Sequence, residues 1–155
     1  MKGGKHMPLR GCTSHCDEHA RSIVSQDRGA TSPKHIANNR KESLVYQYII
    51  DGEVITQGPR CDYLVINEDL KTAYLIELKG SDLEKAAEQL KKTEDRLKLE
   101  SKGYDLSYRI VANKCKTQEI ESTAFRNYRK RWAGNNKFGS KRFVYQSITY
   151  EENIS

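Results

Sequence analysis

The fold of this chain is decided by two neighbouring segments, Arg60-Cys61-Asp62-Tyr63-Leu64-Val65-Ile66 and Ala73-Tyr74-Leu75-Ile76-Glu77-Leu78-Lys79. Both segments are rich in Val, Ile, Leu and Tyr, residue types that favour β-strands. The polar stretch at residues 67–72 between them is typical of a loop. The sequence therefore predicts two antiparallel strands joined as a hairpin.

Charged residues lie at the open end of this predicted hairpin. If the loop centres on Asp69 and Leu70, Asp62 lies directly opposite Glu77, because both are equally far from that centre. Side chains alternate along a strand, so Lys79 shares a face with Glu77. Opposed residues have Cβ atoms about 4.5–5.5 Å apart, which lets two carboxylates hold one cation. The spacing predicts a compact cluster of Asp62, Glu77 and Lys79.

Both faces of the hairpin are largely apolar, which predicts central strands covered by helices on each side. Two unpaired carboxylates buried there would repel each other and lose hydration. A divalent metal and the Lys79 ammonium would relieve both problems, and hard oxygen ligands suit Mg²⁺ or Mn²⁺. The cluster's face also carries Leu64, Ile66, Ala73 and Leu75, and the other face carries Tyr63, Val65, Tyr74, Ile76 and Leu78.

Asp62 followed by Glu77-x-Lys79 at the end of the next strand resembles the core motif of the PD-(D/E)xK nuclease superfamily, which has the restriction-endonuclease-like fold. The resemblance implies that Asp62 and Glu77 are metal ligands and that Lys79 orients or activates the attacking water. Cys61 stands where the family nominally has proline. Taken singly, each motif residue is more simply explained as an exposed ion pair, a cap or a solvated edge residue; the functional interpretation depends on the three residues together.

The order of predicted elements over residues 41–142 is similar to that nuclease core. Apolar segments at 43–50 and 53–55 flank an Asp51-Gly52 turn, and the motif hairpin follows. A helix begins at Ser81 or Asp82 and ends near Gly103; then come a strand over 104–112, a helix from Ser122 or Thr123 through Trp132, and a strand over 143–150. We expect an α/β fold with a central mixed β-sheet flanked by helices and a restriction-endonuclease-like core.

Two more catalytic candidates follow from the resemblance. The family often has a Glu on a helix before the first core strand, and Glu42, in the segment 36–43, is the best placed candidate, with Glu53 as the alternative. Many members also have a Gln on the helix after the Lys, which is the place of Gln89. For Glu42 and Gln89 a solvated helix face is the competing interpretation.

The charge distribution indicates a nucleic-acid partner. The chain has 27 Lys and Arg against 21 Asp and Glu, a net charge of +6. No acidic residue lies between Phe125 and Tyr150, and a basic block there can bind phosphates, with a solvated surface as the alternative. We expect Phe125 and Trp132 in the core. The basic block consists of Arg126, Arg129, Lys130, Arg131, Lys137, Lys141 and Arg142.

The N-terminal residues 1–33 are polar and lack a sustained periodic pattern, so we expect a mobile arm or lid followed by one domain over residues 34–155. Cys12, His15, Cys16 and His19 are zinc-ligand types that one helix face would bring together. Four ligands on one helix turn surround an ion poorly, and free thiols are the alternative.

The sequence also indicates a cellular compartment and an oligomeric state. No apolar run approaches the ~18 residues of a membrane span, and the start of the chain has no signal-peptide pattern. The four scattered cysteines indicate a reducing cytoplasmic compartment. A homodimer is compatible with the nuclease resemblance.

The function predicted from these observations is metal-dependent hydrolysis of nucleic-acid phosphodiester bonds with Mg²⁺ or Mn²⁺, and DNA is favoured over RNA as the substrate. Two alternatives stay open. One is a nucleic-acid-binding module that has the nuclease-like fold without its chemistry. The other is a protein-interaction factor such as an inhibitor or immunity protein.

Overall fold

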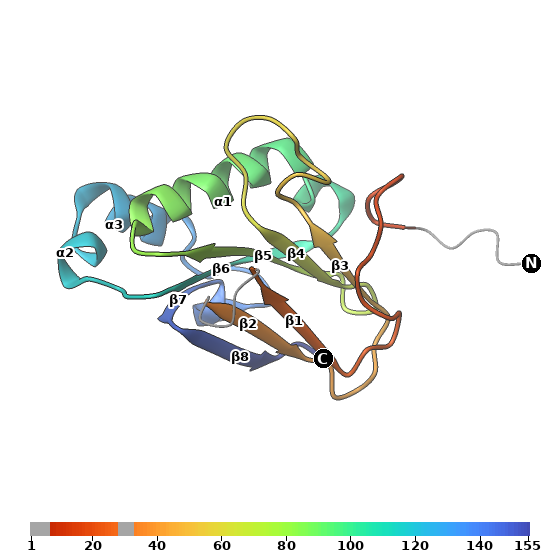
Figure 1. The fold of residues 1–155 in the computed structure, drawn as a ribbon. Coiled ribbons are helices and arrows are strands. Elements are labelled where there is room, and N and C mark those ends of the chain that lie inside the picture. Colours follow the sequence, from red (N-terminus) through yellow and green to blue (C-terminus); the bar gives the residue numbers. More distant parts are fainter. Residues whose placement is uncertain (1–6, 28–32) are drawn as a thin grey trace, which may run out of the picture.

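Two stacked β-sheets form the centre of the protein in a computed structural model that describes residues 7–27 and 33–155. Figure 1 shows the helices α1, α2 and α3 on the side of the larger sheet that faces away from the smaller one. The expectation of an α/β protein with a mixed sheet is confirmed. The expectation of helices on both faces is wrong, because a second sheet covers one face.

The larger sheet contains the predicted hairpin at its centre. Its order is β3-β4-β5-β6-β7, with antiparallel pairing up to β5 and parallel pairing from β5 to β7. The parallel strands therefore end at one common edge, which we call the carboxyl edge. The strands are β3 (Val45–Ile49), β4 (Tyr63–Asn67), β5 (Thr72–Lys79), β6 (Asp105–Ala112) and β7 (Phe143–Ser147).

The smaller sheet contains three strands in the order β1-β2-β8, namely β1 (Ser22–Gln26), β2 (Lys34–Asn38) and β8 (Thr149–Asn153). It corrects three predictions. Strand β1 lies in the stretch expected to be an arm, and the segment expected to be a helix over 36–43 is the end of β2 and a turn. The single strand expected over 143–150 is divided at Ile148, whose φ of 69° redirects the chain from one sheet to the other.

The helices begin where the sequence predicts. The Asp82 carboxylate accepts a hydrogen bond from the Lys85 amide and caps α1 (Leu83–Leu97), which ends at Leu97 and not near Gly103. Ser122 caps α3 (Thr123–Arg131) in the same way. The remaining short helices are η1 (Glu100–Lys102), α2 (Thr117–Ile120) and η2 (Gly139–Lys141).

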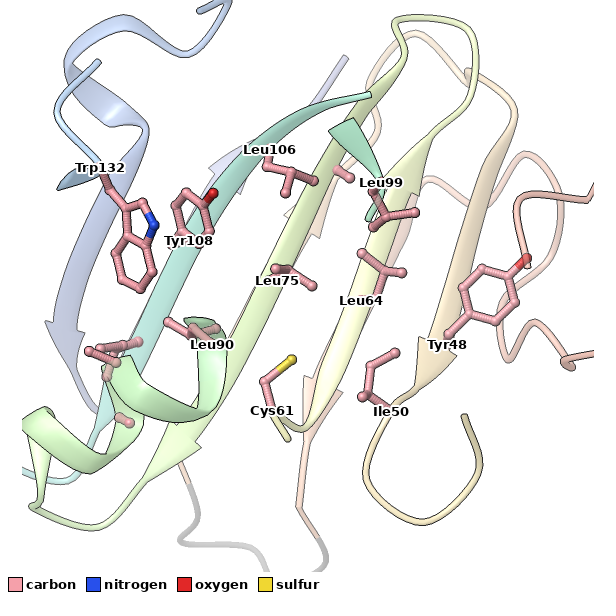
Figure 2. Close-up of a cluster of buried hydrophobic side chains, with 14 of the residues drawn as sticks. Tyr48, Ile50, Cys61, Leu64, Leu75, Leu90, Leu99, Leu106, Tyr108 and Trp132 are labelled. Atoms are coloured by element: carbon pink, nitrogen blue, oxygen red, sulfur yellow. The ribbon is translucent and has the colours of Figure 1, made fainter. Parts of the chain in front are cut away.

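Each face of the larger sheet has its own apolar core. On the helical face, Leu64 and Leu75 pack with Leu90 of α1, and Trp132 stacks on Tyr108 at 4.1 Å between ring centroids (Figure 2). Phe125 and Trp132 are buried there, as expected. On the other face, the second core joins residues of both sheets, including Ile23, Ala37, Val65, Ile76 and Val111.

No helix in the described part of the chain is both long enough and apolar enough to cross a membrane.

Candidate active site

The hairpin of β4 and β5 has the predicted register. Tyr63 pairs with Ile76, which places Asp62 opposite Glu77 one step further along. The Asp62 amide donates to the Ile76 carbonyl at 3.1 Å, and the Asp62 carboxylate accepts from the Leu78 amide at 2.8 Å. Asp62 is therefore bound to β5 on both sides of Glu77, which fixes the two carboxyl groups side by side.

Glu77 is the more deeply buried of these two residues, with 2% of its surface exposed. Its Oε1 atom has no hydrogen-bond partner among the described residues. Burial, and then the Asp62 charge, raise the pKa of Glu77 to about 10, although the Lys79 charge acts in the opposite direction. Burial also raises the pKa of Asp62 to about 6. These raised pKa values leave Glu77 protonated at neutral pH, so the pair carries one negative charge instead of two.

Lys79 is the last residue of β5 and lies on the same face as Glu77 by strand alternation. Its ammonium makes no hydrogen bond to another described residue, and it is partly exposed. The Asn113 amide donates to the Lys79 and Gly80 carbonyls, both at 3.0 Å, which holds the end of β5 against the end of β6. The structure thus brings Asp62, Glu77 and Lys79 together at the carboxyl edge.

Helix α1 fastens the segment that precedes Asp62. The Thr93 hydroxyl accepts a hydrogen bond from the Cys61 amide at 2.7 Å, and the Gln89 side-chain amide donates to the Arg60 carbonyl at 3.1 Å. Gln89 therefore lies near the cluster and positions its backbone. Thr93 was missed by the sequence prediction, because a threonine within an amphipathic helix gives no signal of such a contact.

Two further carboxylates, Asp27 and Asp51, lie close enough to raise the pKa of Asp62 by their charge. Asp27 directly follows β1, and the Gln26 carbonyl before it accepts a hydrogen bond from the Tyr63 hydroxyl at 2.9 Å. Asp51 is paired with Arg60 at 2.7 Å. Sequence analysis missed Asp27 because it assigned that region to an arm.

Glu42 is not part of the cluster. It lies in the turn before β3 with a φ of 52°, whereas the other end of β3 meets Asp62, whose carbonyl accepts from the Ile50 amide. Its nearest ion-pair partner is Arg21, at 3.9 Å. The expected helix around Glu42 does not form, so Glu42 does not occupy the catalytic position that the resemblance implied. The alternative, Glu53, pairs with His15 at 2.8 Å.

The residues of the predicted basic block lie in different environments. Arg126, Arg129, Lys130, Arg131 and Lys141 are exposed. The Lys137 ammonium instead donates to the Leu70 carbonyl at 2.8 Å, at the sheet end opposite the carboxyl edge. The Arg142 side chain is 12% exposed, lies 3.5 Å from Glu100 and covers the Tyr108 ring. Lys137 and Arg142 are thus used within the fold.

The N-terminal Cys and His residues do not share a helix face, since residues 12–19 form an irregular segment. His15 contacts Glu53, His19 hydrogen-bonds the Glu42 carbonyl at 2.8 Å, and the Cys16 thiol lies 3.9 Å from the Val45 carbonyl. Cys12 packs against the helical core and Cys16 against the core between the sheets. The structure does not assemble these four residues into one site.

Within residues 7–27 and 33–155, no group of three or more His, Cys, Asp and Glu side chains is arranged to hold a metal ion alone. Asp62 and Glu77 nevertheless supply two hard oxygen donors, and the unpartnered Glu77 Oε1 is one of them. Mg²⁺ is commonly bound by one or two carboxylates, with waters and substrate phosphates completing its coordination. Asp62 and Glu77 are therefore suitable ligands for Mg²⁺ or Mn²⁺.

Comparisons with protein-family models, with curated proteins and with solved structures gave no match to this chain. The nuclease resemblance therefore rests on the motif residues and on their arrangement.

Proposed function

We propose that this protein is a metal-dependent nuclease with a restriction-endonuclease-like core, which hydrolyses phosphodiester bonds in nucleic acid and prefers DNA. The observation that carries the proposal is the Asp62 and Glu77 pair: Asp62 is half-buried, Glu77 is buried, and the Glu77 Oε1 atom has no hydrogen-bond partner among the described residues, with Lys79 on the same face of the strand. Burying such a pair is costly without a cation to neutralise it. A purely structural role of these two residues does not explain why the fold would bear this free-energy cost.

Asp62 and Glu77 would hold Mg²⁺ or Mn²⁺, which when bound polarises a phosphate and lowers the pKa of a coordinated water. Glu77 would bind the cation as a carboxylate, without the proton that it carries in the absence of metal, and the Leu78 amide keeps the Asp62 carboxylate in place. The Lys79 ammonium, free of hydrogen bonds to described residues, orients the attacking water or stabilises the negative charge that develops on the phosphate. Gln89 and Thr93 keep the backbone before Asp62 in position.

The test is cleavage of plasmid DNA and of single-stranded DNA and RNA with Mg²⁺, with Mn²⁺ and with chelator. Asp62→Asn and Glu77→Gln should each lower the rate by more than about a hundredfold, the order of loss seen when a group that stabilises the transition state is removed. Lys79→Ala should retain metal binding and lose turnover. Circular dichroism and thermal melting check that the fold is retained.

Glu42→Gln is the matched control, because it removes an exposed carboxylate that lies away from the cluster. It should cleave as the unmodified protein does. Full activity of Asp62→Asn or Glu77→Gln would refute the assignment. Binding of nucleic acid without cleavage under any metal condition would favour the non-catalytic binding module instead.

A further inference from the structure

The loop after β6 brings two lysines to the edge of the sheet where the carboxyl pair lies. Strands β5 and β6 are parallel, with Lys79 paired to Ala112, so residues 113–116 leave the sheet directly beside the end of β5. The Asn113 amide fixes this loop through its hydrogen bonds to Lys79 and Gly80. Lys114 and Lys116 follow, both exposed. The basic block predicted from the sequence did not include them.

Helices α2 and α3 lie at the same end of the molecule as this loop. The Glu119 carboxylate of α2 accepts from the Leu83 amide at 3.1 Å, which ties α2 to the start of α1. Figure 1 shows α2 and α3 grouped beside the start of α1, at the end of the molecule where β5 leads into that helix. The chain therefore enters α3 (Thr123–Arg131) at the same end of the molecule as the carboxyl edge.

The exposed side of α3 carries three cations on neighbouring turns. Arg126, Arg129 and Lys130 have the i, i+3 and i+4 spacing of one helix face, and together with Ala133 they line a shallow hollow. Arg129 also lies 6.0 Å from the centre of the Tyr145 ring on β7. Arg126 and Lys130 make no side-chain hydrogen bond to another described residue. Their charges are available to a partner.

The charge balance of this region is strongly positive. Residues 113–133 contain six Lys and Arg against two Glu, and one of these, Glu119, is occupied by the start of α1. Lys137 and Arg142, by contrast, are held by contacts within the fold. Lys137 and Arg142 are therefore left out of the candidate binding surface.

We propose that Lys114, Lys116, Arg126, Arg129 and Lys130 form a phosphate strip that binds the nucleic-acid backbone and leads it to the carboxyl edge. This inference rests on the proposed nuclease function, because it takes the cluster at that edge as the destination of the strand. The strip carries charge and no aromatic ring, so it positions the backbone and does not read bases. Its binding is sensitive to salt and tolerant of sequence.

The test measures the affinity of metal-free protein for a fluorescent DNA duplex by anisotropy over a range of salt concentrations. Lys114→Gln with Lys116→Gln removes one end of the strip, and Arg126→Gln with Lys130→Gln removes the other. Each lost phosphate contact lowers the magnitude of the salt slope by about 0.9, so each double variant should lower it by about 1.8. Affinity near 0.1 M salt should fall at least about tenfold.

The matched control is Lys41→Gln with Lys102→Gln, which removes the same charge from two exposed lysines. Lys41 precedes β3 and Lys102 precedes β6, so both lie at the sheet end opposite the carboxyl edge. The control should bind within about twofold of the unmodified protein, as expected for lysines that contact no phosphate. An equal loss in the control would show a general charge effect and overturn the strip.

Cleavage by the same proteins separates this inference from the nuclease proposal. If the unmodified protein cleaves DNA and both strip variants bind and cleave as it does, the strip is refuted and the nuclease proposal stands. If the strip variants lose binding but no protein cleaves, the strip stands and the nuclease proposal fails. If the unmodified protein binds no nucleic acid, the strip is refuted.

Discussion

Glu77 is a carboxyl group that burial and a neighbouring carboxylate keep protonated in the absence of a cation. Its pKa of about 10 lies far above the ordinary value of 4.5, and desolvation is the largest cause. The folded protein therefore keeps a proton that the unfolded chain releases above pH 4.5. The raised pKa of Glu77 therefore makes its full contribution to the stability of the folded protein below pH 4.5. This contribution is lost progressively as the pH rises towards 10.

Replacing Glu77 by Gln removes this pH dependence, because the amide has no proton to release. In chelator, the melting temperature of the unmodified protein should fall relative to that of Glu77→Gln between about pH 5 and about pH 9. Each kcal/mol of difference corresponds to about 2–4 °C for a chain of this size. Calorimetry across this pH range measures the effect. Parallel curves for the two proteins would show that Glu77 ionises normally.

The sequence predicts the cluster at this scale because the hairpin is symmetric about Asp69 and Leu70, so counting outward fixes which residues face each other. Glu42 shows the limit of such counting. Its proposed place depended on a helix that does not form, and no local pattern reveals that the chain turns there. Asp27 enters through a long-range contact between sheets, which has no local signature.

At the scale of elements, α1 is both a cover for the sheet and a support for the cluster. The Thr93 hydroxyl is fully buried, accepts from the Cys61 amide and donates to the Gln89 carbonyl at 2.8 Å. It therefore connects the helix to the residue next to Asp62. Loss of this hydroxyl leaves a buried amide without a partner.

Thr93→Val should cost about 1–3 kcal/mol in the free energy of unfolding, the usual penalty for an unpaired buried amide. It should also slow cleavage, because the backbone before Asp62 is no longer held. Thr93→Ser keeps the hydroxyl and is the control, with a smaller loss of stability and activity near that of the unmodified protein. Urea unfolding and the cleavage assay provide the two readings. If valine and serine behave alike, the hydrogen bond has no positioning role.

The predictable elements are the capped helices α1 and α3 and the strand β6, which contains Leu, Tyr, Ile and Val. Strands β1 and β2 were missed because their inward positions include Ser25 and His35 as well as Ile23 and Ala37. Polar residues at buried positions remove the hydrophobic alternation on which strand prediction depends. Tertiary contacts, and not local sequence, define those strands.

At the scale of the whole molecule, a buried ion group joins the two sheets. The Arg109 guanidinium of β6 makes two hydrogen bonds to the Glu152 carboxylate of β8, at 2.8 and 3.1 Å. His35 of β2 hydrogen-bonds the same carboxylate at 2.7 Å, and the Tyr74 ring lies against Arg109. Burial acts to raise the pKa of Glu152, but these bonds outweigh it and hold that pKa below its ordinary value.

Glu152→Gln should lower the free energy of unfolding near neutral pH by about 3–5 kcal/mol, because it leaves the Arg109 charge buried without its counter-ion. A carboxylate with a lowered pKa stabilises above its ordinary value of 4.5 and loses that contribution as pH falls. The difference between variant and unmodified protein should therefore shrink under acid conditions. Denaturant titration at several pH values measures it.

Glu151→Gln is the control for this change, since Glu151 is the exposed neighbour on the same strand. Its effect should stay within about 0.5 kcal/mol, as is usual for surface substitutions. A loss in Glu152→Gln no larger than in this control would mean that the buried ion group does not hold the sheets together.

The central claim is that Asp62 and Glu77 together bind one divalent cation, and calorimetric titration of Mg²⁺ or Mn²⁺ tests it most directly. Repeating the titration in buffers of different ionisation enthalpy also counts the protons released. The unmodified protein and Glu42→Gln should bind the metal and release about one proton at neutral pH, the proton that Glu77 carries. Asp62→Asn and Glu77→Gln should lose binding. Undiminished metal binding by Glu77→Gln and Asp62→Asn would contradict the claim.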